Sequence, residues 1–300
     1  MTERFLQQLR QDVELLEAFL TAEIDSSPDT PPRLVEAMRL AVLGGGKRFR
    51  PFLLMESAQI FGVPRSVSVP VAAALECVHC YSLVHDDLPA MDNDKLRRGQ
   101  PTVWHAFDEW TAILVGDALL TLAFEFITRP KMNVKPAIRA ELVHALARAS
   151  GRSGMVGGQC LDLQSDKLGE PAQAELDYIL RLQSMKTGAL LRFACEAGAI
   201  LGEADETDQA AMLRFGECLG LAFQISDDLL DAEGDEGVVG KRTGKDADAG
   251  KATLVGLLGI EPARKRLQDI QAEAETVVSV FGEQSTLLKE AALFVTTRSS

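Results

Sequence analysis

No uninterrupted apolar run in the sequence is long enough to cross a membrane. The most apolar stretch, from Val71 to Val84, is broken by Glu76 and His79, whereas a spanning helix needs about 20 predominantly apolar residues. The N-terminal segment is charged and amphipathic, and it lacks the apolar segment and small-residue cleavage site of a secretory signal. We therefore expect a cytoplasmic protein without stable membrane insertion.

Positive charge is also in short supply. The chain has 31 Lys and Arg residues against 44 Asp and Glu residues, so its formal net charge is −13. Nucleic-acid binding depends on clustered cations that neutralise phosphates, and anionic membrane surfaces attract basic segments for the same reason. The composition therefore excludes nucleic acid as the expected partner.

The five cysteines form no recognisable framework. Cys77 and Cys80 make one CxxC pair, but no second pair completes a zinc site and no βαβ pattern surrounds it. The pair lies in an alanine-rich stretch, and free Cys is among the most buried residue types. We expect reduced thiols in the core.

Alternating β-branched runs that would predict strands are missing as well. Apolar residues instead recur every three or four positions, as at Phe5, Leu9, Val13 and Leu16. Breaks are expected at residues 26–32, 44–46, 62–64, 129–136, 151–158, 202–208, 234–250 and 259–262. We predict an all-α fold of roughly ten or more helices. No low-complexity linker divides the chain, so residues 1–300 should form one domain.

Three of the predicted helices, 69–84, 112–127 and 215–230, are apolar on most of their surface. Such helices belong inside a large bundle. The glycine-rich polar stretch 234–251 has the composition of a mobile lid.

Two acidic clusters each follow an apolar helical run. In the second, Asp227 and Asp231 are four residues apart and share one helix face, with Asp228 beside them. Like charges at this spacing repel, and a buried acidic triplet is costly unless it is paired or holds a metal. A carboxylate cluster without Cys or His favours a hard divalent ion such as Mg²⁺.

The first cluster contains Asp86, Asp87 and Asp92 in the sequence DDLPAMD. Pro89 should break the helix near Leu88, which would let Asp92 turn back towards the pair. Asp94 could be a further ligand or a solvated charge. Either cluster alone could be a solvated helix end.

A calcium loop is a second alternative for the acidic residues. The sequence DAEGDEG, which begins at Asp231, echoes the start of an EF-hand. Its twelfth position is Arg242 instead of the required Glu, so this interpretation fails.

Basic residues lie near both clusters, as a metal–diphosphate site requires, because Mg²⁺ usually completes its shell with substrate phosphates. They occur in GGGKRFRP at 44–51, at Arg97 and Arg98, at Lys186 in KTG, and at Lys241, Lys245 and Lys251. Taken singly, GGGKR could be only a loop that ends a helix, and 241–251 only a solvated turn.

Together these motifs resemble the trans-isoprenyl diphosphate synthases, most closely the bacterial farnesyl diphosphate synthases. The likeness runs from about Arg33 to Lys251 and rests on GGKRFRP, CVHCYSLVHDDLPAMDNDKLRRGQPTVW, GDALL, KTG, FQISDDLLD and GKRTGKD, in the family's order. The resemblance implies a helical bundle around a deep central cavity, and usually a homodimer, for which 112–127 could supply the interface.

The resemblance also implies roles for individual residues. Isopentenyl diphosphate would be bound by Lys47, Arg50, His79, Arg98 and Phe223. About three Mg²⁺ ions would be held by Asp86, Asp87, Asp92, Asp227, Asp228 and Asp231. The allylic diphosphate and its chain would contact Arg97, Lys186, Thr187, Gln224, Lys241 and Lys251. The segment 251–259 lacks the aromatic–proline pair expected after the KxT element, a departure that weakens the role of Lys251.

Tyr81 is the candidate for setting product length. It lies five residues before Asp86, about 7.5 Å along a helix axis, and a bulky residue there resembles the pocket floor of synthases that stop at C15. Ser82 is small and would add little blockage. We therefore predict farnesyl diphosphate, with geranylgeranyl diphosphate as the alternative. Tyr81 could also be only a core aromatic.

Other classes of protein explain fewer of these motifs. A class I terpene cyclase would replace the second DDxxD with an Asn/Ser/Glu triad and would not need GGKRFRP. A regulatory subunit of a heteromeric synthase would lose one aspartate motif, and this chain keeps both. An acidic helical interaction protein leaves the paired motifs unexplained.

Overall fold

The computed structural model describes residues 2–26, 28–171, 175–233 and 253–297. In chain order the elements are α1 (Glu3–Asp25), α2 (Pro32–Leu43), α3 (Phe49–Ile60), α4 (Arg65–Asp86), β1 (Leu96–Arg97), β2 (Gln100–Pro101), α5 (Val103–Ala106), α6 (Glu109–Thr128), α7 (Pro136–Ser150), α8 (Met155–Leu168), α9 (Leu176–Gln183), η1 (Ser184–Gly188), α10 (Ala189–Leu201), α11 (Glu206–Glu233), α14 (Leu254–Leu258), α15 (Ile260–Val278), η2 (Ser279–Ser285) and α16 (Thr286–Thr297). The predicted all-α class is confirmed, apart from one small antiparallel pair, β1 and β2.

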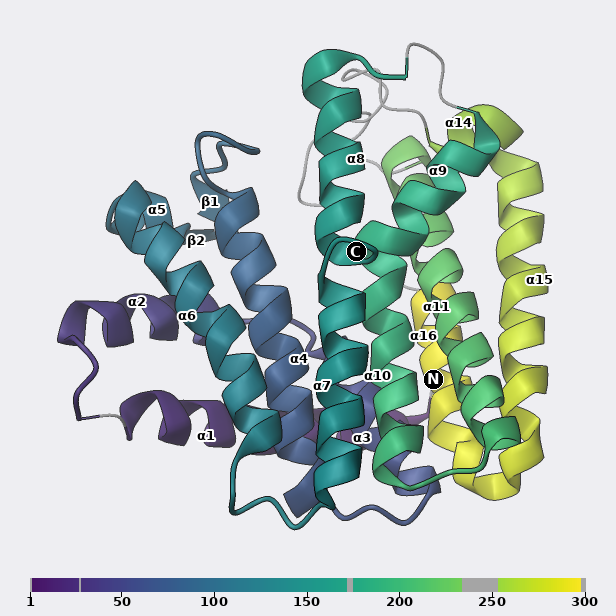
Figure 1. Ribbon diagram of the computed structural model, residues 1–300. Coiled ribbons are helices and arrows are strands. Elements are labelled where there is room, and N and C mark those ends of the chain that lie inside the picture. The colour runs from purple at the N-terminus through teal and green to yellow at the C-terminus, as the bar shows by residue number, and fades with distance from the viewer. Residues whose placement is uncertain (1, 27, 172–174, 234–252, 298–300) are drawn as a thin grey trace.

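The long helices stand side by side, while α1 and α2 lie across one end of the array (Figure 1). The two ends of the described chain meet, because the Thr2 backbone N–H and hydroxyl both donate to the Glu290 carboxylate of α16. Aromatic rings fill the space between them: Phe5 lies 5.3 Å from Phe52 and 5.7 Å from Phe294, centroid to centroid. The first and last helices are therefore parts of one core.

Helix α4 is the central element of this core. Its side chains from Ser68 to Val78 are all buried, and Cys77 and Cys80 are free buried thiols, as the sequence predicts. Its C-terminal turn packs closely on α6, since a Cβ built on Gly116 would come within 2.0 Å of the His85 ring. This contact holds the end of α4, and the first aspartate motif with it, against a fixed neighbour.

Helix α6 is less buried than the sequence suggests. Trp110, Ile113 and Leu114 are exposed, so the prediction that 112–127 lies inside the bundle is wrong for one face. By length and composition α4 and α6 are both apolar enough to cross a membrane, which the interrupted runs had not indicated. The apolar window of α4 is 78% buried within the protein, against 44% for α6. Helix α4 is thus a core helix, and α6 leaves an apolar face uncovered.

Some breaks between helices were not predicted, among them the one between α15 and α16 and the one after α8. Helix α8 starts at Met155, inside the predicted break 151–158, and ends at Leu168, where Gly169 takes a left-handed φ of 65° as the C-cap. Pro171 follows two residues later, a common helix-stop signal. The chain then resumes as α9 and passes through the π-helical turn η1 into α10.

Candidate active site

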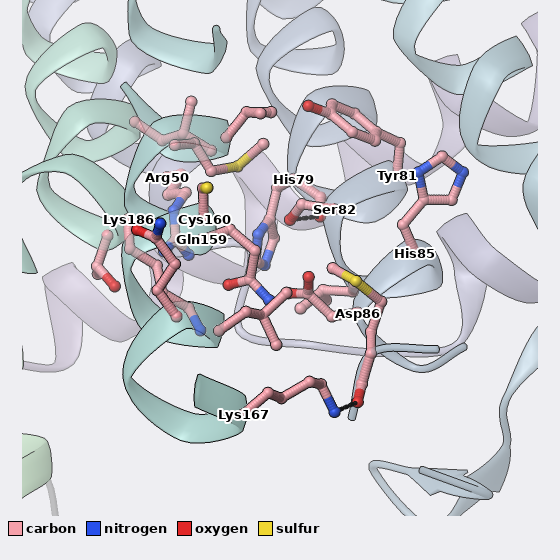
Figure 2. Close-up of a pocket in the computed structure, with 18 of the residues that line it drawn as sticks. Arg50, His79, Tyr81, Ser82, His85, Asp86, Gln159, Cys160, Lys167 and Lys186 are labelled. Atoms are coloured by element: carbon pink, nitrogen blue, oxygen red, sulfur yellow. Dashed lines mark hydrogen bonds between the residues drawn. The ribbon is translucent and has the colours of Figure 1, made fainter. Parts of the chain in front are cut away.

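Two cavities meet inside the bundle, and Arg50 and His79 line both. The first, of about 630 Å³, lies between α4, α8 and η1 (Figure 2). The second, of about 580 Å³, lies between the start of α3, α4, α11 and α16. Because Arg50 and His79 line both, ligands filling the two cavities would lie next to each other on either side of these two side chains.

The second cavity gathers a predicted set of residues from four separate parts of the chain. Its lining contains all five positions assigned to isopentenyl diphosphate: Lys47, Arg50, His79, Arg98 and Phe223. The Arg50 guanidinium lies 5.8 Å from the Phe223 ring centroid, and the Lys47 ammonium lies 5.7 Å from the Phe294 centroid. Phe294 is a residue that sequence reasoning missed, because no motif marks the C-terminal helix.

Arg48 lies between Lys47 and Arg50 in the sequence, and its guanidinium is held by carboxylates. Its guanidinium is buried, pairs with Glu76 at 2.7 Å and with Glu17 at 3.2 Å, and also donates to the Val42 carbonyl. The backbone at Arg48 has a left-handed φ of 47°. Arg48 lines the second cavity together with Lys47 and Arg50, but its own bonds hold the loop to the core.

His79 has a strongly altered environment at the junction of the cavities. Burial lowers the pKa of its imidazole well below the ordinary value, and the charges of Arg50 and Arg98 lower it further. The ring is therefore neutral near pH 7 and offers one N–H donor and one acceptor nitrogen. Arg98 is held by a bond from its Nη1 to the Gly45 carbonyl.

The first aspartate motif begins where α4 ends. The helix stops at Asp86, and the Asp92 backbone N–H then donates to the Asp86 carbonyl at 2.8 Å. This is the predicted break and return of the chain around Pro89. Burial raises the pKa of Asp86 to about 7; the positive charge of Lys186 opposes this shift and the negative charge of Asp92 adds to it. Burial is thus the main reason that Asp86 holds a proton more tightly than an exposed carboxylate does.

Asp87 and Arg97 form a tight ion pair in the same motif. Arg97 Nε donates to Asp87 Oδ1 at 2.9 Å and Nη2 to the same oxygen at 2.6 Å. Asp87 is only 3% exposed, and burial raises its pKa despite the neighbouring Arg97. Arg97, predicted to contact the allylic diphosphate, therefore has a carboxylate partner already.

The three carboxylates of the second motif differ in exposure. At the end of α11, Asp227 is exposed, Asp231 is half-buried and Asp228 is buried. Asp228 Oδ2 accepts the Leu254 backbone N–H at 2.9 Å and the Gln183 amide at 3.4 Å. Asp228 thus fastens α11 to α14 and α9. Across the described residues, no three His, Cys, Asp or Glu side chains are close enough together to hold one metal ion.

The KTG motif lies in the π-helical turn η1, a form often found at functional sites. Lys186 and Thr187 line the first cavity, and Lys186 Nζ pairs with Asp162 at 2.5 Å. A Cβ on Gly158 would lie 2.2 Å from the Lys186 backbone nitrogen, so only glycine lets α8 pack directly on this turn. Asp162 was missed by sequence reasoning, although the run GGQCLDL around it was available as a signal.

Tyr81 and Ser82 both line the first cavity. Tyr81 is 6% exposed and its ring lies 5.8 Å from the His85 ring. Burial raises the pKa of Tyr81 to about 12, with a further contribution from the charge of Asp86. Gln224 is half-buried on α11. Lys241 and Lys251 lie outside the described residues, as does the rest of the glycine-rich stretch.

Comparison with known proteins gives one family. Residues 31–284 match the family model "Polyprenyl synthetase". Farnesyl diphosphate synthase of Escherichia coli is 43% identical over 94% of this chain and 93% of that protein. Geranylgeranyl diphosphate synthase of Cyanophora paradoxa is 39% identical over 90% of this chain and 89% of that protein.

Solved structures agree with the sequence comparison. An FPP/GFPP synthase from Zymomonas mobilis superposes with a TM-score of 0.90 at 43% identity, covering 98% of this chain and 100% of that one. A geranyltransferase from Legionella pneumophila has a TM-score of 0.88 at 33% identity, covering 99% and 98% of the two chains. The match thus extends over nearly the whole chain.

Proposed function

Because the chain belongs to the polyprenyl synthetase family, we propose that it is a prenyltransferase that condenses isopentenyl diphosphate with dimethylallyl or geranyl diphosphate. The product is farnesyl diphosphate, and pyrophosphate is released. The whole of residues 1–300 acts as one catalytic domain. The observation that carries the proposal is the pair of cavities that share Arg50 and His79, because a condensation needs two diphosphate substrates held in contact.

The second cavity suits isopentenyl diphosphate. Lys47, Arg50 and Arg98 supply positive charge for its diphosphate, and Arg offers several donors to phosphate oxygens. Phe223 supplies an apolar surface beside them for the five-carbon chain. A neutral His79 donates a hydrogen bond to the diphosphate. It adds no positive charge, which would bind the diphosphate of the product as tightly as that of the substrate.

The first cavity suits the allylic substrate. Its mouth carries Asp86 and Lys186, whereas Tyr81 and Leu190 make its interior apolar. The diphosphate therefore lies at the mouth and the hydrocarbon chain points inward. Thr187 lies beside Lys186 on the same turn and faces the reacting end of that chain.

Divalent metal suits the mouth of this cavity, since the donors that the two aspartate motifs offer are carboxylates. Asp86, Asp92, Asp227 and Asp231 would hold about three Mg²⁺ ions, and Asp87 and Asp228 would orient the two motifs through their own bonds to protein. When bound, the metal supplies stabilisation of the negative charge that develops on departing pyrophosphate. Lys186 and Arg97 add to this stabilisation, and Lys241 and Lys251 are the further candidates.

The reaction itself needs no covalent enzyme intermediate. The C1–O bond of the allylic diphosphate breaks and its electron pair leaves with pyrophosphate. The double bond of isopentenyl diphosphate supplies the electrons of the new C–C bond to C1, and a proton passes from the isopentenyl group to pyrophosphate. The protein holds the two chains in line at the junction of the cavities and excludes water from the cation.

Product length follows from the floor of the first cavity. Tyr81 blocks the inner end along α4, which favours a C15 product over a C20 product, while Ser82 leaves space beside it. The exposed apolar face of α6, with Trp110, Ile113 and Leu114, supports a homodimer. The protein is proposed to act in the cytoplasm.

Product analysis tests the proposal directly. The protein is incubated with Mg²⁺, isopentenyl diphosphate and dimethylallyl or geranyl diphosphate, and we expect farnesyl diphosphate by mass spectrometry. Asp86→Asn should lower kcat on the order of a hundredfold or more, whereas Asp166→Asn, on the exposed face of α8, should match the wild type. A hydrocarbon product would indicate a cyclase, and a C20 diphosphate would indicate geranylgeranyl diphosphate synthase. Full activity in excess chelator would contradict the metal assignment.

A further inference from the structure

Gln159 is the clearest unexplained polar group in the first cavity. Its side-chain oxygen and nitrogen are both buried, and within the described part of the chain neither has a hydrogen-bond partner. A buried amide without partners destabilises the folded protein, so native structures seldom contain one. Such a group in a cavity that takes a ligand points to a contact that forms only when the ligand is bound.

The position of Gln159 is fixed by the packing of α8. Met155 and Leu163 lie one turn on either side of it and line the same cavity, so Gln159 interrupts an apolar stripe. The preceding Gly158 lets α8 contact the Lys186 backbone directly, and Asp162 pairs with the Lys186 ammonium at 2.5 Å one turn further on. The amide is therefore held on a rigid wall beside Lys186.

The amide stands at the boundary between the polar and the apolar parts of the cavity. In Figure 2 the Gln159 side chain extends from α8 into the space that His79 and Asp86 face from α4. The diphosphate of an allylic substrate would lie on the side of Asp86 and Lys186, and its chain on the side of Tyr81. The atom at the boundary between these parts is C1 of the allylic group, where the C–O bond breaks.

We propose that Gln159 is a catalytic residue of the condensation, an inference that rests on the proposed function. Its amide oxygen faces C1 and stabilises the positive charge that develops there, and its NH₂ donates to an oxygen of the departing pyrophosphate. Both contacts strengthen as the C1–O bond breaks, because charge separates between the two ends of the amide dipole. The bonds broken and formed are those of the condensation described above, and Gln159 gains or loses no proton.

The test compares Gln159→Met with the wild type in steady-state kinetics and thermal unfolding. Met has nearly the same length without the dipole, so we expect kcat to fall on the order of a hundredfold with little change in KM for either substrate, as for the loss of a transition-state contact. We also expect the melting temperature to rise, because the buried amide without partners is gone. The control Gln59→Met, on the exposed surface of α3, should change neither.

Each outcome decides the proposal. An unchanged kcat in Gln159→Met, or a higher KM at unchanged kcat, would overturn it. Gln159→Asn keeps an amide but places it one methylene further from the cavity, so its kcat should also fall. If the Met variant failed to fold, full activity of the Asn variant would by itself count against the assignment. If the wild type makes no prenyl diphosphate, the proposed function fails; if the wild type is active and both variants equal it, this inference fails alone.

Discussion

Two buried carboxylates share one arginine at the junction of α1, α3 and α4. Arg65 Nε donates to Asp12 Oδ1 at 2.9 Å, Nη2 donates to Glu56, and Nη1 donates to the Met55 carbonyl at 2.7 Å. Asp12 is 1% and Glu56 4% exposed. A single positive charge cannot compensate two buried negative charges, so the group is most stable with one proton shared between the carboxylates.

The stabilising effect of this proton depends on pH in a definite direction. Burial is the main cause that raises the pKa of Glu56, from 4.5 to about 7; Arg65 opposes the shift and the negative charge of Asp12 adds to it. The folded state therefore binds the proton more tightly than the unfolded state. The resulting contribution to stability is fully present below pH 4.5 and is lost as the pH rises through 7. At 1.36 kcal/mol per pKa unit the loss is about 3 kcal/mol.

Glu56→Gln removes this dependence, because Gln imitates the protonated acid and still accepts a bond from Arg65. Urea unfolding at pH 5 and pH 8 should show the wild type losing about 2–3 kcal/mol more than the variant over that interval, because part of the loss has already occurred at pH 5. Glu14→Gln, an exposed position on the same helix as Asp12, should follow the wild type. Parallel pH curves for wild type and Glu56→Gln would refute the shared-proton account.

Two further substitutions test the cavities. Tyr81→Ala should open the floor of the first cavity and lengthen the product by at least one five-carbon unit, measured by chromatography of the dephosphorylated products; an unchanged C15 product would leave Tyr81 as a core aromatic only. Lys47→Ala should raise KM for isopentenyl diphosphate on the order of tenfold, with less effect on the allylic substrate, and equal effects on both would contradict its place in the second cavity. Arg48→Met should instead destabilise folding by about 3–5 kcal/mol, measured by urea unfolding, because it leaves Glu76 buried without its partner.

Much of the fold followed from apolar spacing and turn residues. The helices α1, α2, α3, α4 and α7 begin and end close to the predicted breaks, because Gly and Pro mark most of those ends directly, whereas α6 begins at Glu109, where no break was predicted. The stop at Gly169 was missed, since a single glycine in a polar stretch is a weak signal until Pro171 is considered with it. The exposed face of α6 could not be predicted, because periodicity indicates an apolar helix but not which neighbours cover it.

The residues that form the candidate site could be predicted from the sequence, whereas the ion pairs among them could not. Motif order identified Lys47, Arg50, His79, Arg98 and Phe223, and the structure brings them to one cavity. Neither the pairing of Arg97 with Asp87 nor that of Lys186 with Asp162 could be inferred from spacing, because each joins segments whose approach depends on how the helices pack. Gln159 belongs to the same GGQCLDL run as Asp162, but within that run only its lack of partners in the folded chain distinguishes it.

The basic side chains of the two cavities have different partners, and this difference explains why we expect metal ions in the first cavity. In the second cavity Arg50 and Lys47 lie over aromatic rings, which attract a cation without carrying a negative charge. In the first cavity Lys186 is joined to Asp162, and Arg97, which lies outside the cavity lining, is joined to Asp87, so both cations are largely neutralised by carboxylates. We therefore expect a diphosphate to bind in the second cavity through the basic side chains of the protein. In the first cavity we expect it to bind only together with divalent cations, which would also stabilise the charge of the leaving pyrophosphate.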